Sequence, residues 1–269
     1  CSILTILMPL VSAGTTTDVT VALVNGTGTY TEAISVTADR AGRASSLTPA
    51  VQALRSADML DLRGVLISSS HRGAYPDDDD ALPFFELCQS LDIPVFIHPP
   101  SVGFGEERMK DYRLASSVGR PFDNCLALSR LIVRGIYERF PRLKIVASHL
   151  GGGICEIIGR MDYAYEIRDE GYFLGTYEPM LITRKPSDYL KMMYMDTTSY
   201  HAPAIRCAAE TIGADAVLLD CSTVAPSTET KIAEALAAAV VDAPLSGGAE
   251  GARNGTCTAF VGGSDVAFA

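Results

Sequence analysis

The sequence contains no cysteine pair in CxxC spacing, no apolar run long enough to span a bilayer and no basic patch interleaved with aromatic residues. With 22 Lys and Arg against 32 Asp and Glu, the formal net charge is -10, and we expect no nucleic-acid partner. The one candidate membrane or targeting segment, residues 3–13, contains Pro9 and is too short to cross a membrane. We therefore expect a globular protein with no membrane partner.

The seven cysteines lie mostly in apolar stretches, which indicates small buried thiols rather than disulfides. A reducing, cytoplasmic compartment is therefore expected. Residues 3–13 also lack the basic start of a signal peptide and are expected to form a strand. The first residue is Cys1 rather than Met, which suggests a fragment.

From residue 61 onward, short apolar segments that end in polar residues alternate with longer helix-like segments. This alternation is typical of a parallel α/β fold. Strands are expected at 64–69, 94–98, 143–149, 193–197 and 216–220. Helices are expected at 81–91, 124–140, 154–167, 202–212 and 228–239. Residues 14–50 have weak periodicity, so the register of a strand such as 19–24 is poorly specified.

Two of the four histidines stand at the ends of predicted strands. His98 follows the apolar run in IPVFIHPP, and His149 follows LKIVAS and precedes three glycines. Because ligands bind at the carboxyl ends of parallel strands, we expect the two imidazoles to converge over one site. A structural hydrogen-bonding role is the alternative for either histidine alone. We expect glycines 151–153 to allow a tight turn and to leave open space beside the imidazole.

Four further features are weaker candidates. His71 lies in a loop, where solvent exposure explains it as well as substrate contact does. His201 begins a predicted helix, where capping or packing is expected. Asp196 ends a strand and either reaches the same site or accepts hydrogen bonds from loop amides. The acidic run 77–80 precedes a helix, so capping and dipole complementation are expected, with a cation site as the alternative.

Six segments between about 61 and 219 resemble one family of metalloenzymes: RGVLISS, DIPVFIHPP, GRPFDN, RFPRLKIVASHLGGG, GRMDYAYE and YMDTTSYHAPA. They are similar to the amidohydrolase-related enzymes of the aminocarboxymuconate-semialdehyde decarboxylase and resorcylate decarboxylase type. The resemblance implies a distorted (β/α)8 barrel with one divalent metal, usually zinc, for which His98 matches a ligand. It also implies that His149 carries the proton or helps to activate water, while the metal orients the substrate carboxylate or polarises water.

The sequence departs from this family at two metal-ligand positions. The family's first strand carries a His-x-His pair, but no histidine precedes His71 here. The family's last strand ends in a Gly-Ser/Thr-Asp-Tyr-Pro type segment, whereas here VLL is followed by Asp220, and Ser222 stands where the aspartate is expected. A shift of two residues moves a carboxylate about 6–7 Å along a strand, well beyond a metal–oxygen bond of about 2 Å. We expect a weak metal site in an incomplete barrel.

The stretch DCSTVAPSTETKIAEALAAAVVDAPLSGGAEGARNGTCTAFVGG resembles the β-hydroxyacid dehydrogenases of the 3-hydroxyisobutyrate type. By this resemblance Ser222 and Thr223 lie in the cofactor-binding part, and Ser246, Gly247 and Gly248 hold the substrate carboxylate. The G-x-G-x-x-G turn that seats a cofactor pyrophosphate is absent, and the sequence ends before the family's catalytic lysine. We therefore do not expect NAD(P) to bind.

The predicted fold class is α/β, with an incomplete (β/α)8 TIM-barrel-like domain followed by a Rossmann-like fragment. We divide the chain into a poorly defined segment 1–60, a barrel portion 61–219 and a dehydrogenase-like fragment 220–269. Each part is expected to have unpaired strand edges. We expect the other part, or a partner chain as in a homo-oligomer, to cover these edges.

The first functional hypothesis is a metal-dependent carboxy-lyase or hydrolase for a small carboxylated substrate, aromatic acids included, either active or inactivated by loss of metal ligands. The alternatives are a fragment of an NAD(P)-dependent oxidoreductase and a non-catalytic chimeric remnant. The residues that discriminate among substrates are expected in loops such as 101–113.

Overall fold

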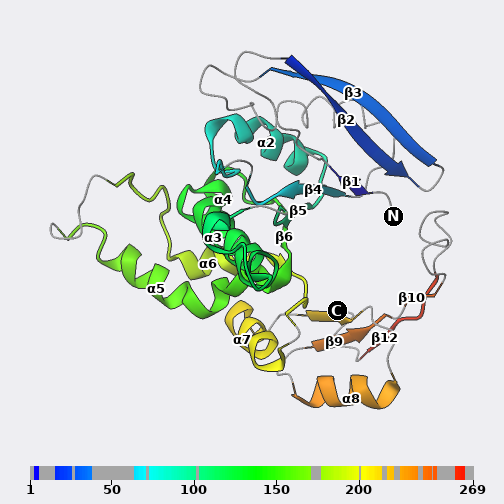
Figure 1. The fold of residues 1–269 in the computed structure, drawn as a ribbon. Coiled ribbons are helices and arrows are strands. Elements are labelled where there is room, and N and C mark those ends of the chain that lie inside the picture. Colours follow the sequence, from blue (N-terminus) through cyan, green and yellow to red (C-terminus); the bar gives the residue numbers. More distant parts are fainter. Residues whose placement is uncertain are drawn as a thin grey trace.

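The computed structural model describes residues 3–5, 16–25, 28–37, 64–70, 73–100, 103–170, 177–199, 201–213, 217–220, 225–235, 239–243, 245–246 and 258–263. The largest sheet in this part of the chain has seven strands (Figure 1). These are β1 (Ile3–Thr5), β2 (Thr16–Asn25), β3 (Gly28–Thr37), β4 (Gly64–Ser68), β5 (Val95–His98), β6 (Ile145–Ala147) and β7 (Tyr194–Met195). Their spatial order is β3-β2-β1-β4-β5-β6-β7.

Five neighbouring strands of this sheet, β1 and β4 to β7, run parallel, and β2 and β3 add an antiparallel hairpin at one edge. The parallel pairing aligns Ser68 with His98, and Ile97 with Ala147. The carboxyl ends of β4, β5 and β6 therefore lie at one edge of the sheet. The α/β class with a parallel barrel-like sheet is confirmed, whereas the weak periodicity of residues 14–50 did not specify the hairpin.

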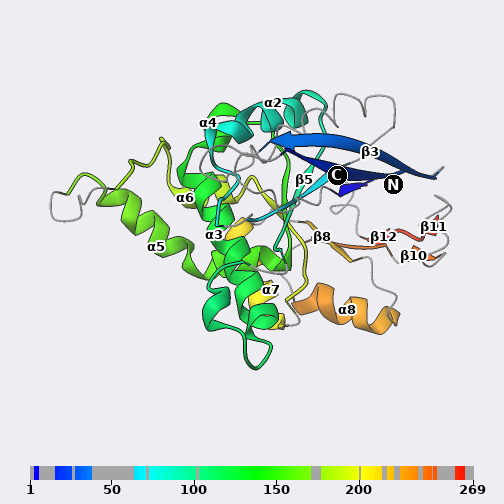
Figure 2. The same ribbon diagram turned by 45° about the horizontal axis from the view of Figure 1, so that its top comes forward.

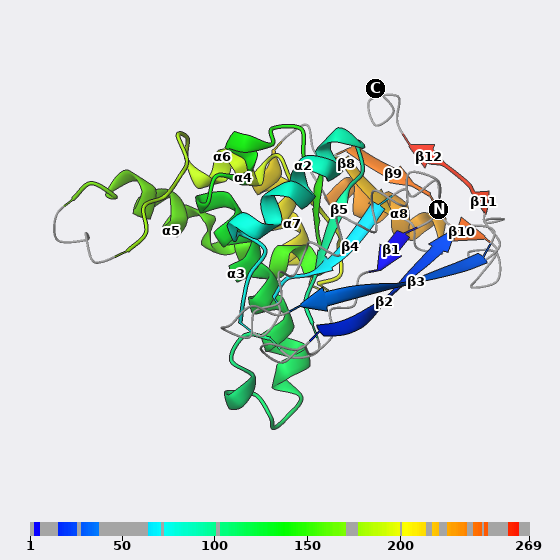
Figure 3. The same cartoon turned by 90° about the horizontal axis from the view of Figure 1, so that it is seen from above.

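Helices and short turns of helix connect the parallel strands or follow the last of them. They are η1 (Asp79–Ala81), α2 (Leu82–Ser90), η2 (Glu106–Arg108), η3 (Ala115–Gly119), α3 (Arg120–Val133), α4 (Ile136–Arg139), η4 (His149–Gly153), α5 (Ile154–Glu166), α6 (Pro186–Leu190) and α7 (Ala202–Ile212). Figure 3 shows α2, α3, α5 and α6 gathered to one side of the strands. Their apolar faces pack with the strands into one core that includes Val65, Ile67, Phe84, Phe85, Val95, Ile97, Leu128, Leu131, Ile132 and Ile145.

The helix expected at 124–140 is divided into α3 and α4 at Gly135, which has a φ of +74°. A Cβ at this position would lie 2.2 Å from the carbonyl oxygen of Leu181. Glycine thus meets two demands here, a left-handed backbone and the close approach of another chain segment. The prediction of one continuous helix was wrong for this reason.

A second sheet contains β8 (Val217–Asp220), β9 (Ala239–Asp242) and β12 (Gly262–Gly263), in the order β12-β9-β8. Strands β8 and β9 are parallel and are connected through α8 (Pro226–Ala235), which lies alongside them in Figure 2. A separate pair is formed by β10 (Leu245–Ser246) and β11 (Thr258–Ala259). The β8-α8-β9 unit is the parallel strand–helix–strand arrangement expected of a Rossmann-like fragment.

The acidic run before α2 contributes to packing rather than to helix capping. Asp78 is the N-cap of η1 but makes no side-chain capping hydrogen bond. Instead, Nε of Arg130 donates to Asp77 at 2.7 Å, and Nη2 of Arg134 donates to Asp79 at 3.0 Å. These ion pairs attach the run to α3. The capping part of the expectation was wrong, whereas Asp79 and Asp80 do lie in the first turn of η1, as dipole complementation requires.

No helix in the described ranges has the length and apolar character needed to cross a membrane. Four described cysteines, Cys88, Cys125, Cys155 and Cys207, are free thiols.

Candidate active site

The side chains of His98 and His149 lie next to each other at the carboxyl ends of β5 and β6. Their ring centroids are 5.2 Å apart, and the ring planes are tilted by 52°. His98 is the last residue of β5, on the face opposite the fully buried Val95 and Ile97. His149 comes two residues after the end of β6. The two imidazoles therefore share one edge of the parallel sheet.

Ser148 and Asn124 hold the two histidines in this arrangement. The backbone N–H and the hydroxyl of Ser148 both donate to the carbonyl oxygen of Ile97, at 3.1 and 2.8 Å. The side-chain amide of the fully buried Asn124 donates to the carbonyl oxygen and to the hydroxyl of Ser148, at 2.8 Å each. These bonds connect α3 to the residues that immediately precede the two histidines.

A left-handed turn carries His149. All five residues of η4 have positive φ, from 52° at His149 and Leu150 to 94° at Gly153. The conformation is strained for the two residues that have a side chain and accessible to the three glycines. A Cβ on Gly152 would lie 1.8 Å from the carbonyl oxygen of Pro121. The tight turn expected from the glycines is present, but at Gly152 the first turn of α3 fills the space that we expected to be open.

The environment of His149 favours its neutral form. Burial lowers the pKa of His149 from its ordinary value, and the neighbouring His98 lowers it further. Asp196 and a hydrogen bond with the Thr198 backbone oppose this shift, but each contributes less than burial or His98. The Nε2 atom of His149 is buried and has no hydrogen-bond partner among the described residues. A neutral imidazole with an unpaired nitrogen can accept a proton or bind a cation.

The imidazole of His98 is oriented by its own loop. Its Nδ1 lies 2.9 Å from the carbonyl oxygen of Pro99. Because a carbonyl oxygen only accepts, Nδ1 carries the proton and Nε2 is the free nitrogen of the neutral ring. A backbone carbonyl on the second nitrogen is typical of metal-binding histidines.

The described residues do not complete a catalytic metal site. No three His, Cys, Asp or Glu side chains within the described ranges lie close enough together to hold one ion. A catalytic zinc ion usually keeps three protein ligands. Asp196 is close to His149, but its Oδ1 accepts hydrogen bonds from the backbone N–H of Leu150 at 3.2 Å and of Thr198 at 2.9 Å. This pattern corresponds to the loop-amide interpretation of Asp196.

Two other predicted site residues lie in the part of the chain that the structure describes, and both are exposed. His201 is the exposed N-cap of α7 and makes no side-chain capping hydrogen bond. Ser246 is exposed in β10, opposite Thr258 of β11. His71 and the four remaining residues of the dehydrogenase-like pattern lie outside the described residues: Ser222, Thr223, Gly247 and Gly248.

A buried carboxylate beneath the site was missed by the sequence analysis. Asp123 of α3 is fully buried and accepts hydrogen bonds from the hydroxyls of Ser69, Ser70 and Tyr75. It also accepts from the backbone N–H of Phe104, at 3.0 Å. Asp123 thus joins the end of β4 to the loop that starts at residue 103. Its spacing of four and eight positions from two apolar helix residues, 127 and 131, was a signal that it faces the core.

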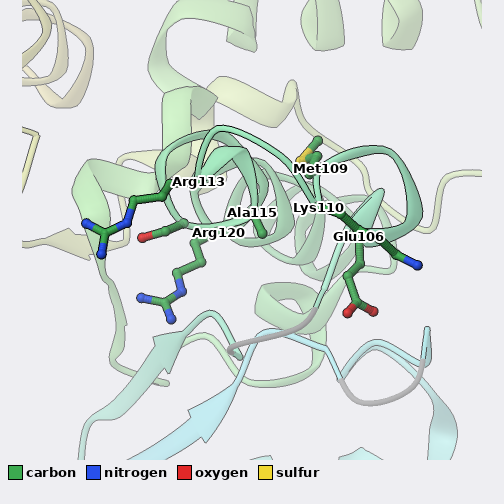
Figure 4. Close-up of a pocket in the computed structure, with 7 residues that line it drawn as sticks. Glu106, Met109, Lys110, Arg113, Ala115 and Arg120 are labelled. Atoms are coloured by element: carbon green, nitrogen blue, oxygen red, sulfur yellow. The ribbon is translucent and has the colours of Figure 1, made fainter.

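A cavity of about 630 Å³ lies where that loop meets the start of α3 (Figure 4). It is lined by Glu106, Met109, Lys110, Arg113, Ala115, Ser116 and Arg120. Three of its side chains are cationic and one is acidic, in a protein with a net charge of -10. Part of this loop, 101–113, is where we expected the substrate-discriminating residues.

Comparison with known proteins gives two matches along the chain. The family model described as Amidohydrolase matches residues 10–219, and the model of the NAD binding domain of 6-phosphogluconate dehydrogenase matches residues 192–269. The 2-amino-3-carboxymuconate-6-semialdehyde decarboxylase of Dictyostelium discoideum is 31% identical over 160 residues, which cover 60% of this chain and 43% of the relative. The 3-hydroxyisobutyrate dehydrogenase of Pseudomonas aeruginosa is 54% identical over 56 residues, or 20% of this chain and 19% of the relative.

Two solved structures have a similar fold. 5-Carboxyvanillate decarboxylase from Sphingomonas paucimobilis has a TM-score of 0.55 and 28% identity, over 63% of this chain and 51% of its own. Dihydroxybenzoic acid decarboxylase from Polaromonas, with bound manganese and 2-nitroresorcinol, has a TM-score of 0.52 and 25% identity, over 63% of this chain and 53% of its own. The chain thus spans about half the length of these decarboxylases. These matches confirm both resemblances drawn from the sequence, and the match over residues 10–219 shows that the chain belongs to the amidohydrolase family.

Proposed function

We propose that the chain carries part of the active site of a decarboxylase for small aromatic carboxylates. The observation that carries the proposal is the pair of imidazoles 5.2 Å apart at the carboxyl ends of adjacent parallel strands. The relatives support the substrate class, because two of them are named for the decarboxylation of 5-carboxyvanillate and of a dihydroxybenzoic acid. Since the chain spans about half of each relative, activity and substrate are proposals for this protein.

In this proposal His149 transfers the proton. Decarboxylation breaks the bond between the carboxyl carbon and the ring carbon, releases CO2 and requires a proton on the ring carbon in its place. The lowered pKa of His149 makes its protonated form a stronger acid than an ordinary imidazolium, which favours delivery of the proton. The unpaired, buried Nε2 is the atom that carries it.

A divalent metal belongs to the proposal through the relatives, one of which contains manganese. We propose His98 as a ligand, and zinc is the metal that the sequence resemblance favours. His98 and His149 alone fall short of the usual three ligands. No proton-transfer step above depends on the metal.

The test is CO2 release from 5-carboxyvanillate and from 2,6-dihydroxybenzoate, with Mn²⁺ or Zn²⁺ supplied. We expect turnover by the natural sequence and a loss of at least a hundredfold for His149→Asn, since general acid catalysis contributes about 10²–10⁴ in rate. His201→Asn is the matched control, because His201 is an exposed histidine at the start of α7. Absence of turnover with both acids and both metals would contradict the proposal.

Metal analysis tests His98 separately. His98→Ala is expected to lower the bound metal per chain, measured by mass spectrometry after dialysis. Unchanged metal content in a protein that does bind metal would show that His98 is not a ligand.

The second candidate function concerns residues 217–263 alone. The parallel β8-α8-β9 unit and the 54% identity to a 3-hydroxyisobutyrate dehydrogenase support a nucleotide-binding ancestry for this segment. NADPH fluorescence on mixing with the protein tests it. Because the phosphate-binding turn is missing from the sequence, we expect no change, and an enhancement that saturates would favour the oxidoreductase alternative.

A further inference from the structure

We propose that the cavity formed by residues 106–120 is a carboxylate-binding site in which Arg113 and Arg120 bind the acid group and Met109 and Ala115 contact the ring. The identification of the ligand as an aromatic acid rests on the proposed function. The existence of an anion site in this cavity rests on the geometry of the cavity alone.

Arg120 is the central residue of this site. Its Nε is buried and has no hydrogen-bond partner among the described residues. A guanidinium always carries its charge, so an unpaired buried N–H of this group is unfavourable unless an anion meets it. Carboxylates fit the guanidinium fork with two parallel hydrogen bonds. Because Nε is closed to solvent, a carboxylate in the cavity would meet the other nitrogens of this guanidinium, whose charge no described carboxylate pairs with.

A second arginine lies on the same side of the cavity. Figure 4 shows the guanidinium groups of Arg113 and Arg120 extending to one side of the helical turns, whereas Glu106 and Lys110 extend to the other. No ion pair links either arginine to a carboxylate within the described residues. On this side two cations thus face the cavity without an acidic side chain, and Glu106 is placed to balance Lys110.

The backbone around the cavity is unusual at three points. Tyr112 and Arg113 both have positive φ, 56° and 60°, which is rare for residues with a side chain. They are followed by a π-helical turn, Ala115–Gly119, that leads directly into α3. Strained backbone and π-helical turns are both frequent at functional sites. Here they direct the side chains of Arg113 and Arg120 into one cavity.

A packing contact links the start of α3, beside the cavity, to the turn that carries His149. Pro121, the neighbour of Arg120, packs against Gly152 of the turn that carries His149. An acid group bound at Arg120 would thus lie next to the residue that packs against the turn of His149.

The apolar part of the lining fits a ring of modest size. Met109 packs against Gly119, where a Cβ would lie 3.0 Å from its sulfur. A thioether makes favourable contacts with aromatic rings. A cavity of about 630 Å³ lies within the usual size range of small-molecule sites.

Calorimetric titration with benzoate tests the site without turnover, with benzamide as the uncharged counterpart. We expect benzoate to bind at least tenfold more tightly than benzamide. Arg120→Gln should weaken benzoate binding at least tenfold, Arg113→Gln about threefold, and Arg120→Lys should give an intermediate affinity because it keeps the charge and loses the fork. Arg108→Gln is the matched control, because Arg108 lies on the same segment, pairs with Glu107 and does not line the cavity.

Equal affinity of Arg120→Gln and the natural sequence, or of benzoate and benzamide, would overturn the inference. The two proposals fail in different ways. If the protein decarboxylates 5-carboxyvanillate and Arg120→Gln leaves KM and benzoate affinity unchanged, the decarboxylase stands and the cavity site falls. If no acid is turned over but Arg120→Gln still weakens benzoate binding and Arg108→Gln does not, the cavity site stands and the decarboxylase falls.

Discussion

Replacing Asp123 by alanine removes a fully buried carboxylate and leaves its four donor residues without their common acceptor. The hydroxyls of Ser70 and Tyr75 lie 2.8 and 2.9 Å from its oxygens, and the backbone N–H of Phe104 lies 3.0 Å away. The hydroxyl of Ser69 is the fourth donor. Asp123 is therefore the only described side chain that links the end of β4, Tyr75 and the cavity loop through one group.

The expected loss of unfolding free energy is about 3 kcal/mol, because hydrogen bonds to a charged acceptor contribute about 1.5–3 kcal/mol each and the neutral donors lose theirs. Hydroxyl groups can rotate toward other acceptors, but the N–H of Phe104 has a fixed direction and stays unpaired. Leaving one buried donor unsatisfied costs about 1–3 kcal/mol. Asp123→Asn keeps one oxygen for the Phe104 N–H, so we expect a smaller loss of about 1–2 kcal/mol.

Urea unfolding followed by circular dichroism measures both losses, provided that the m-value stays constant. Asp111→Ala is the matched control, because Asp111 is an exposed carboxylate on the same loop. A loss below about 1 kcal/mol for Asp123→Ala would show that the network is not coupled to folding. Since Phe104 precedes the cavity segment, benzoate affinity should fall together with stability, and an unchanged affinity would refute the link between this network and the cavity.

The other predictions concern the turn at His149, its support and the acid stability of the fold. Gly152→Ala should cost about 3 kcal/mol or more in thermal unfolding, because its Cβ would lie 1.8 Å from the carbonyl oxygen of Pro121. Gly159→Ala, in α5 with no atom within 4 Å of the new Cβ, should instead stabilise by about 0.5–1 kcal/mol. Asn124→Ala should cost about 2–3 kcal/mol in urea unfolding, because it removes two buried hydrogen bonds. Hydrogen bonds from neighbouring groups lower the pKa of Glu138 from 4.5 to about 2, so its carboxylate stabilises the fold above pH 4.5 and loses this effect as the pH falls toward 2. Glu138→Gln should therefore destabilise by about 1 kcal/mol at pH 7, after allowance for solvent exposure, and by less at pH 3.

The positions of β4 and β5 were predicted to within about one residue, because each is a short apolar run between polar turns. The prediction for β6 was longer than the strand itself, 143–149 against Ile145–Ala147. Ladder pairing ends where Ser148 turns to bond with Ile97 and the left-handed turn begins. The point where the strand ends depends on how this turn packs against α3. A local sequence pattern does not show a contact between segments that are distant in the sequence.

The sequence predicted that the two histidines converge, which the structure confirms, and missed the residues that surround them. Strand-end histidines are recognisable because topology alone brings strand ends together. Arg120 was not recognisable, because its role depends on how residues 106–119 fold back over the start of α3. Asn124 and Asp123 carried a usable signal, since both lie on the apolar stripe of an amphipathic helix where unpaired polar groups are unfavourable.

The pairing of β8 bears on the ligand count of the proposed metal site within the described residues. The segment that follows the barrel-like pattern, Val217–Asp220, pairs with β9 in the second sheet, where Asp220 aligns with Asp242. Within the described residues the parallel sheet that carries His98 and His149 ends at β7, so this strand adds nothing to its carboxyl edge. In a parallel barrel the ligands of one ion come from the ends of several neighbouring strands. The last residue of this strand, Asp220, is therefore paired in the second sheet and not in the sheet whose carboxyl edge carries His98 and His149.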